Sequence, residues 1–132
     1  MEELAACTAK RIGDREFYCF FQLSQMIMGG KWKPKILFYL SQSESIRFGK
    51  LRDAIIGVSE KMLIQNLREL ERDGIVHREV YKQVPPKVEY SLTPLGKTII
   101  PIMRAQFEWG KAVRFLFGGG GRIGAGRGFG EH

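Results

Sequence analysis

Apolar residues near the start of the chain recur with the spacing of helices. Residues 15–28 carry a broad stripe of phenylalanine, leucine, methionine and isoleucine, which Asp14 precedes as a candidate N-cap and a glycine pair follows as a stop. A second helix is expected over residues 31–41. Pro34 lies in its first turn, where the lack of an N–H group costs no hydrogen bond. Its apolar residues cover most of its circumference, which indicates a buried helix.

A pair of helices joined by a tight turn is expected next. After a very short strand at residues 46–47, residues 48–55 have the i, i+3, i+7 spacing of a short amphipathic helix. A turn containing Gly57 leads to a longer helix, for which Ser59 is a good N-cap and the Asp-Gly pair at 73–74 a good stop. Helix, three-residue glycine turn and helix together predict a helix-turn-helix.

After this motif the period changes from that of helices to that of strands. Residues 76–82 are rich in β-forming residues and residues 87–92 alternate between apolar and polar, with a Pro-Pro turn between the two runs. Thr93 is a candidate N-cap of a last helix that extends to Phe117 and is expected to kink at Pro101. A hairpin directly after the motif is a wing. The predicted fold class is mainly α with a small β-hairpin wing, a winged helix-turn-helix.

Length and composition agree with one such domain. The chain has 132 residues, of which 44% are hydrophobic and 27% charged, and these are ordinary values for a globular protein. We expect a flexible N-terminal arm at residues 1–14, the folded domain at 15–117 and a glycine-rich disordered tail at 118–132. The helices at both ends of the domain are expected to mediate dimerisation.

Charge, hydropathy and the number of cysteines limit the class of binding partner and the cellular compartment that we expect. The formal net charge is +7, which favours a polyanion such as nucleic acid as the partner. No apolar run is long enough to span a membrane, and the polar N-terminus is unlike a secretory signal. Two cysteines without such a signal indicate the reducing cytoplasm rather than a disulfide framework.

The helix expected at residues 59–73 carries the most informative polar pattern. Leu63, Leu67 and Leu70 share one face, which must point to the core. On the opposite face, about 140° to 200° around the helix from Leu63, lies what we call the donor stripe, a row of hydrogen-bond donors with no acid among them: Lys61, Gln65, Arg68 and Arg72. The stripe spans about 17 Å, which suits a helix that lies along the major groove of DNA.

The residue types of the donor stripe match the chemistry of DNA. Arg and Lys pair with phosphates or with guanine, and Gln can form two hydrogen bonds with adenine. Because the N-terminal part of such a helix usually reaches the bases, base contacts are expected from Ser59, Lys61, Met62 and Gln65. Phosphate contacts are expected from Arg68 and Arg72, and backbone or minor-groove contacts from the wing residues Arg78, Lys82 and Lys87. The alternative is that these residues are the ordinary solvated surface of a helix and a hairpin.

A series of blocks between Cys19 and Phe117 strongly resembles the HxlR family of winged-helix regulators, which is related in fold to the MarR regulators. The blocks occur in the family's order and are Cys19, 29–32 (GGKW), 47–51 (RFGKL), 56–63 (IGVSEKML), 67–74 (LRELERDG) and 84–96 (VPPKVEYSLTPLG). The resemblance implies a homodimer built from the first and last helices, one recognition helix per subunit, and control of nearby genes.

The resemblance also draws attention to Cys19, which matches the cysteine through which some members of the family sense oxidants or electrophiles. The family often has Pro directly after this cysteine, and Phe20 here would allow the first helix to start earlier and to include Cys19. Arg15, one helical turn earlier, and the helix N-terminus would then stabilise a thiolate. Alternatively, Cys19 is an inert packing residue among aromatic neighbours. Cys7 is either incidental or a resolving partner.

No combination of residues in the sequence points to catalysis. His77 and His132 are far along the chain from both cysteines, so no metal-ligand spacing is present, and we find no nucleophile elbow, phosphate loop or pair of catalytic carboxylates. We therefore expect no enzyme activity, no metal and no cofactor. Three aromatic residues either line an effector pocket or, as is more common, anchor the core or the dimer interface: Trp32, Phe107 and Trp109.

Two classes of function remain. The first is a sequence-specific transcriptional regulator that binds a pseudo-palindromic operator on double-stranded DNA as a homodimer, with an oxidant or a small molecule as its candidate effector. The second is a winged-helix protein-interaction module that does not contact DNA. An interaction module would more often show apolar anchors where this chain has the donor stripe, so the pattern favours the regulator.

Overall fold

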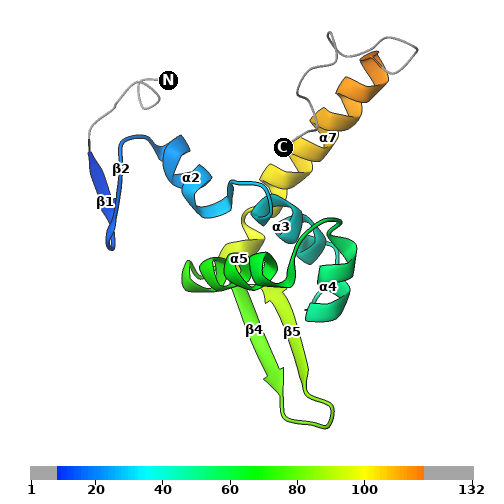
Figure 1. Cartoon of the computed structure of the whole chain (residues 1–132). Coiled ribbons are helices and arrows are strands. Elements are labelled where there is room, and N and C mark those ends of the chain that lie inside the picture. Colours follow the sequence, from blue (N-terminus) through cyan, green and yellow to red (C-terminus); the bar gives the residue numbers. More distant parts are fainter. Residues whose placement is uncertain (1–8, 118–132) are drawn as a thin grey trace.

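Helices dominate residues 9–117, the part of the chain that the computed structural model describes (Figure 1). Three antiparallel strands form a sheet in the order β3-β5-β4, and two more form a separate hairpin near the N-terminus. The fold is therefore mainly α with a small sheet, as the sequence predicts. In chain order the elements are β1 (Lys10–Ile12), β2 (Arg15–Phe17), α2 (Phe20–Met28), α3 (Lys33–Ser41), β3 (Ile46–Arg47), α4 (Phe48–Ala54), α5 (Glu60–Arg72), β4 (Val76–Tyr81), β5 (Lys87–Leu92), α6 (Pro94–Lys97) and α7 (Ile100–Phe117).

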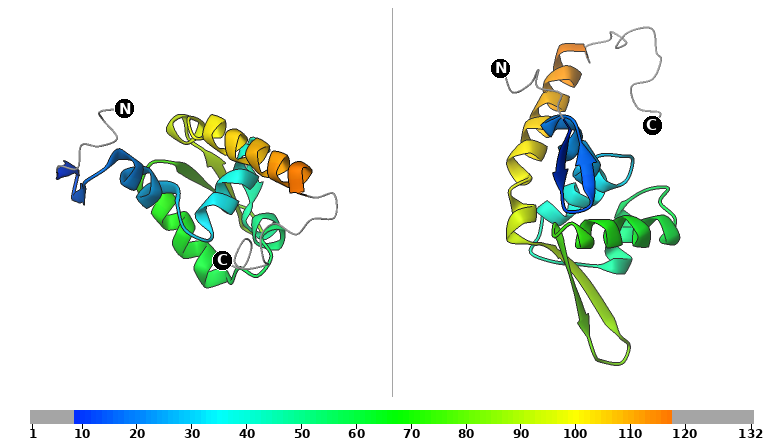
Figure 2. Two further views of the ribbon diagram at one scale, coloured as in Figure 1. Left: turned by 90° about the horizontal axis from the view of Figure 1, so that it is seen from above. Right: turned by 90° about the vertical axis from the view of Figure 1, so that its left-hand side faces the viewer.

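The core lies where α3, α4 and α5 meet each other and the base of the sheet. These three helices supply the most deeply buried side chains: Ile36, Leu37, Leu40, Leu51, Leu63, Leu67 and Leu70. Burial of each such side chain contributes about 1.5–3 kcal/mol, so the leucine face of α5 is strongly held inward. Figure 2 shows the result: α7 rises on one side of this body, and the wing of β4 and β5 extends on the other.

The ends of α5 are defined by a turn, a cap and a glycine stop. Gly57, with a φ of 87°, adopts the left-handed conformation that only glycine enters readily, and so makes the tight turn after α4. The Ser59 hydroxyl accepts a hydrogen bond from the Met62 N–H at 3.1 Å, which caps the helix. At the other end Gly74 has a φ of 77°, and the Ile75 N–H donates to the Leu70 carbonyl at 2.9 Å, as in a Schellman motif. The helix-turn-helix expected from the sequence is confirmed.

The wing is a regular antiparallel hairpin. Strands β4 and β5 pair from Val76 opposite Leu92 to Tyr81 opposite Lys87, and Ile46 of the short β3 pairs with Tyr90 on the far side of β5. Val76, Tyr90 and Leu92 are buried at the base, whereas β4 is exposed beyond Val76. The wing is thus anchored in the core at one end and free at the other.

The first helix begins later than the sequence pattern suggests. Residues Arg15–Phe17 form strand β2, which pairs with β1 across a two-residue turn in which Gly13 has a φ of 61°. Asp14 therefore lies in a hairpin turn and is not a helix cap, and Cys19 is the N-cap of α2 and does not lie inside it. The expected helix at 15–28 is wrong for residues 15–19, because the glycine allows a hairpin and because Phe17 is buried as a strand residue.

The last helix is divided in two before Pro101. Thr93 caps α6 as expected, with its hydroxyl accepting from the Gly96 N–H at 2.9 Å. The chain then makes i to i+3 turns at Thr98 and Ile99 before α7 begins. Pro101 lies in the first turn of α7, where a missing N–H costs no helical hydrogen bond. The expected kink inside one long helix is therefore wrong.

Several large apolar side chains of α2 and α7 are exposed. On α7, Phe115 is 87% and Trp109 63% exposed, and Phe21 of α2 is exposed as well. No helix within residues 9–117 combines the length and the apolar character that crossing a membrane requires.

Candidate nucleic-acid interface

Helix α5 has one buried and one exposed face. Leu63, Leu67 and Leu70 are at most 1% exposed, so the face opposite them points to solvent. All four members of the donor stripe are exposed: Lys61, Gln65, Arg68 and Arg72. Its three cations make no salt bridge with any side chain in residues 9–117. The stripe is therefore accessible to an anionic partner.

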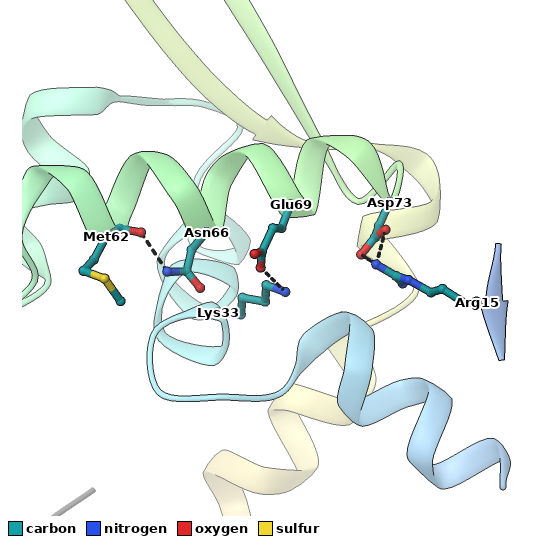
Figure 3. Close-up of polar contacts among 6 residues, drawn as sticks. All are labelled: Arg15, Lys33, Met62, Asn66, Glu69 and Asp73. Atoms are coloured by element: carbon teal, nitrogen blue, oxygen red, sulfur yellow. Dashed lines mark hydrogen bonds and ion pairs between the residues drawn. The ribbon is translucent and has the colours of Figure 1, made fainter. Parts of the chain in front are cut away.

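Two acidic residues flank the donor stripe: Glu71 lines a cavity with Arg68 on one side, and Glu69 lines another with Lys61, Gln65 and Arg68. Within residues 9–117, Glu69 is the one that is paired. Its carboxylate lies 2.7 Å from the Nζ of Lys33 at the start of α3 (Figure 3). The hydrogen bond from Lys33 is the main reason that the pKa of Glu69 lies below its usual range, and attraction to Arg72 acts in the same direction. The negative charge of Glu69 beside the stripe is thus balanced from within the protein.

The other two residues expected to contact bases lie at the N-terminal end of α5. Ser59 is exposed, and its hydroxyl oxygen already accepts a hydrogen bond as the N-cap, which leaves its O–H free to donate. The Met62 side chain is also exposed. The Asn66 amide donates to the Met62 carbonyl at 2.7 Å (Figure 3), so it satisfies the helix backbone. The amide of α5 that remains on the outward face is that of Gln65.

The structure brings one wing residue together with the donor stripe. A cavity of about 350 Å³ lies between α5 and the wing, and Arg68 of α5 and Arg78 of β4 both line it. Val88 and Tyr90 of β5 supply apolar walls to the same cavity. Arg78 and Arg68 thus meet at one place from two elements, together with the carboxylate of Glu71, which lines the same cavity.

The two other wing residues lie elsewhere. Lys87 pairs with Tyr81 in the sheet register, three residues from Arg78, so Lys87 and Arg78 face opposite sides of the hairpin. The Lys87 Nζ lies 2.9 Å from Glu89 and 4.6 Å from the centre of the Tyr81 ring. The hydrogen bond from Lys87 also lowers the pKa of Glu89. Lys82 is exposed just beyond the end of β4.

Cys19 lies apart from α5, and its surroundings differ from those expected. The residue is half-buried. Arg15 is on strand β2, and its guanidinium forms an ion pair with Asp73 at 2.7 Å, at the C-cap of α5 (Figure 3). The expectation that Arg15 lies one helical turn before Cys19 is therefore wrong, and the charge of Arg15 is paired with a carboxylate. Cys7 lies outside the described residues.

The three aromatic residues considered for an effector pocket do not gather at one place. Phe107 stacks on Phe38 and lines a cavity of about 450 Å³ between α3 and α7, and neither tryptophan lines that cavity. Trp32 is half-buried and packs against the core, whereas Trp109 is exposed. Within residues 9–117, no three His, Cys, Asp or Glu side chains lie together as a candidate metal site.

Two ion pairs that hold α5 in place escape sequence analysis. Lys33 is buried, although lysines are seldom buried unless paired, and Asp73 pairs with a residue 58 positions away. Neither partner could be found from local patterns.

The fold is that of a winged helix-turn-helix protein. Helices α3, α4 and α5 pack together, a glycine turn joins α4 to α5, and the wing follows α5. The model of the HxlR-like helix-turn-helix family matches residues 27–115. The chain therefore belongs to the HxlR-like helix-turn-helix family.

Similar proteins agree with this assignment. The HTH-type transcriptional regulator YdeP of Bacillus subtilis is 47% identical over 96 residues, which make up 73% of this chain and 74% of that protein. The redox regulator HypR in its oxidised form has a TM-score of 0.68 and 46% identity, over 71% of this chain and 96% of that one. A Porphyromonas gingivalis protein described as a MarR-family regulator has a TM-score of 0.68 and 41% identity, over 77% and 97% of the two chains.

Proposed function

We propose that the chain is a transcriptional regulator that binds double-stranded DNA in a sequence-specific way, with α5 in the major groove. The observation that carries the proposal is the exposed, acid-free donor stripe on the second helix of a helix-turn-helix. The names of relatives such as YdeP support the regulatory role. No enzymatic activity forms part of this assignment.

The contacts that we propose follow the order of residues along α5 and the wing. Base contacts come from Ser59, Lys61, Met62 and Gln65, and phosphate contacts from Arg68 and Arg72. Arg78, beside Arg68, and the exposed Lys82 contact the DNA backbone or the minor groove. The ammonium of Lys87 is paired with Glu89 in the free protein. Lys87 therefore contacts the DNA only if it leaves Glu89 and binds a phosphate instead.

We further propose that the protein acts as a homodimer on a pseudo-palindromic operator. The exposed apolar side chains of α2 and α7, with Phe115 and Trp109 foremost, offer a surface that a second copy would cover. Two copies would place two α5 helices on successive major grooves, about 34 Å apart. Sedimentation at micromolar concentration is expected to show twice the 15.1 kDa mass of one chain.

Cys19 is the candidate redox sensor. The support is that Cys19 is only half-buried and that the chain resembles the redox regulator HypR in both its oxidised and its reduced form, with a TM-score of 0.68 to each and 46% and 45% identity. Because Cys19 is the N-cap of α2, a bond formed there would shift a helix that we place at the dimer interface. Mild oxidation is expected to change operator affinity in the wild type and not in Cys19→Ser. Equal responses of the two proteins would make Cys19 a packing residue.

The experiment that tests DNA binding is a gel shift with the region upstream of the chain's own gene. The wild type is expected to bind this region more tightly than an unrelated duplex of equal length. Binding should be lost when Lys61, Gln65, Arg68 and Arg72 are replaced together by Ala. Unchanged binding would make the stripe a solvated surface and would favour the protein-interaction module.

A further inference from the structure

The donor stripe of α5 runs between two other parts of the protein. On one flank, Ile64, Arg68 and Glu71 of α5 line a cavity together with residues of the wing. On the other flank, the carboxylate of Glu69 lies 2.7 Å from the Nζ of Lys33 at the start of α3 (Figure 3). Glu69 and Glu71 point about 160° away from each other around the helix. The wing and the start of α3 therefore stand on opposite sides of the stripe.

A helix that lies in the major groove has a phosphate backbone on each side of it, because the two strands of the duplex bound the groove. In the function proposed above, Arg78 and Lys82 of the wing contact the backbone on one side. Contacts to phosphate and sugar fix the orientation of a protein on the duplex, and the backbone on the other side has as yet no partner. The part of the protein on that side is the start of α3.

Two exposed lysines gather on one aromatic ring at the start of α3. The Nζ of Lys31 lies 4.8 Å and the Nζ of Lys35 lies 5.1 Å from the centre of the Trp32 ring. Both lysines are exposed, and neither forms a salt bridge with any side chain in residues 9–117. Two ammonium groups this close repel each other, and a bound anion would relieve the repulsion. We call these three residues the lysine–tryptophan cluster.

The lysine–tryptophan cluster is held in place beside α5. Trp32 is half-buried and packs against the core. Its Cη2 atom lies so close to the turn before α5 that a Cβ atom on Gly57 would be 3.9 Å from it. The next residue, Lys33, is held to α5 by its ion pair with Glu69. Because the face of an indole attracts ammonium groups, the ring keeps the two lysines on this flank of α5.

We propose that Lys31 and Lys35, gathered on Trp32, form a second phosphate-binding site, which contacts the DNA backbone on the side of the major groove opposite the wing. This inference rests on the proposed function, in which α5 lies in that groove. The ammonium groups act as point charges on phosphate oxygens, and such contacts carry no sequence information. The site therefore adds affinity and fixes the orientation of α5 without adding a base preference.

The first test removes the two charges and keeps the length of the side chains. In the double variant Lys31→Met and Lys35→Met, the apolar stems still cover the Trp32 ring. The slope of log affinity against log salt is expected to become shallower by about two units, one for each phosphate contact. The ratio of affinities for a selected and a scrambled duplex should stay unchanged. Replacing both lysines by Arg should keep the wild-type slope, and so should the control that removes the exposed cations Lys97 and Arg104 of α6 and α7.

The second test locates the site with duplexes in which single phosphates are replaced by uncharged methylphosphonates. A phosphate whose neutralisation weakens binding of the wild type marks a contact. Phosphates whose neutralisation no longer matters in the methionine variant are those that Lys31 and Lys35 touch, and the double variant Arg78→Ala and Lys82→Ala identifies those of the wing in the same way. We expect two separate sets, on opposite sides of the major groove in each half-site.

The outcomes separate the inference from the proposed function. A shallower salt slope in the methionine variant, together with two separate sets of phosphates, supports the inference. An unchanged slope, a changed base preference, or a set of phosphates that coincides with that of the wing overturns it and leaves the DNA-binding function intact. Failure of the wild type to bind any duplex overturns the proposed function, and the inference with it.

Discussion

At the scale of single residues, the donor stripe contains side chains with separable roles. Replacing Gln65 by Ala should cost about 1–3 kcal/mol at the cognate site and relax the preference for one base pair. Fluorescence anisotropy with the cognate duplex and with its single-base variants measures both effects. A Gln65→Ala protein that binds every variant as the wild type does would contradict the assignment.

Arg72, at the other end of the stripe, should behave differently. Because a phosphate contact carries no sequence information, Arg72→Ala should weaken binding to all duplexes alike. It should also reduce the slope of log affinity against log salt by about one unit. Lys97→Ala, which removes an exposed cation from α6, serves as the control and should leave the slope unchanged. A change of base preference in Arg72→Ala would show that Arg72 reads bases.

The Lys33–Glu69 ion pair predicts how stability depends on pH. Because the pKa of Glu69 is lowered by folding, its contribution is present above the unfolded value of 4.5 and is lost as the pH falls through the folded value. Urea unfolding of the wild type should therefore show a steeper loss of stability below about pH 4.5 than unfolding of Lys33→Met. Parallel pH profiles of the two proteins would show that the ion pair contributes nothing measurable.

The exposed residues of α5 could be predicted from the sequence, whereas the residues that hold this helix in place could not. Leu63, Leu67 and Leu70 determine the buried face, and helical geometry then places Gln65 and Arg68 opposite. No such local rule connects Lys33 with Glu69 or Arg15 with Asp73, because these ion pairs depend on how separate elements pack.

At the scale of elements, the ends of the chain depart from the sequence expectation for identifiable reasons. Phe17 and Phe20 lie three positions apart, a helical spacing, and the centres of their rings are 5.9 Å apart although Phe17 is in a strand. The Gly13 turn makes the hairpin available, and burial of Phe17 selects it. Near Pro101 the helical spacing of apolar residues continues from α6 into α7, although the backbone is not helical between them. A break this short leaves the spacing of apolar residues almost unchanged, so the sequence pattern does not reveal it.

Replacing Gly96 tests how α6 packs against the start of the wing. A Cβ atom at this position would lie far inside van der Waals contact with the backbone carbonyl of Ile75. Gly96→Ala should therefore cost about 1–3 kcal/mol or more and lower the melting temperature by several degrees. In Gly49→Ala the new Cβ meets nothing closer than the end of the Arg52 side chain at 3.9 Å, so its melting temperature should be unchanged or raised. A stable Gly96→Ala protein would contradict this packing.

At the scale of the whole molecule, the exposed apolar side chains of α7 predict association. Phe115→Glu should shift the sedimentation profile towards the single chain, because a carboxylate cannot be covered without a large desolvation cost. Val84→Glu changes an even more exposed apolar residue at the tip of the wing and should leave association unaltered. Identical profiles for wild type and Phe115→Glu would place the interface elsewhere.

The central claim is that the protein binds DNA through the outward face of α5. The most direct measurement compares the wild type with two triple variants that lose the same charge, using a duplex selected by the wild type and a scrambled duplex. One variant replaces Lys61, Arg68 and Arg72 by Ala, and the other replaces the exposed cations Lys97, Arg104 and Arg114 of α6 and α7. The account predicts that the first loses its preference for the selected duplex while the second keeps it. Equal losses in both variants would mean that net charge, and not the face of α5, determines binding, and would contradict the claim.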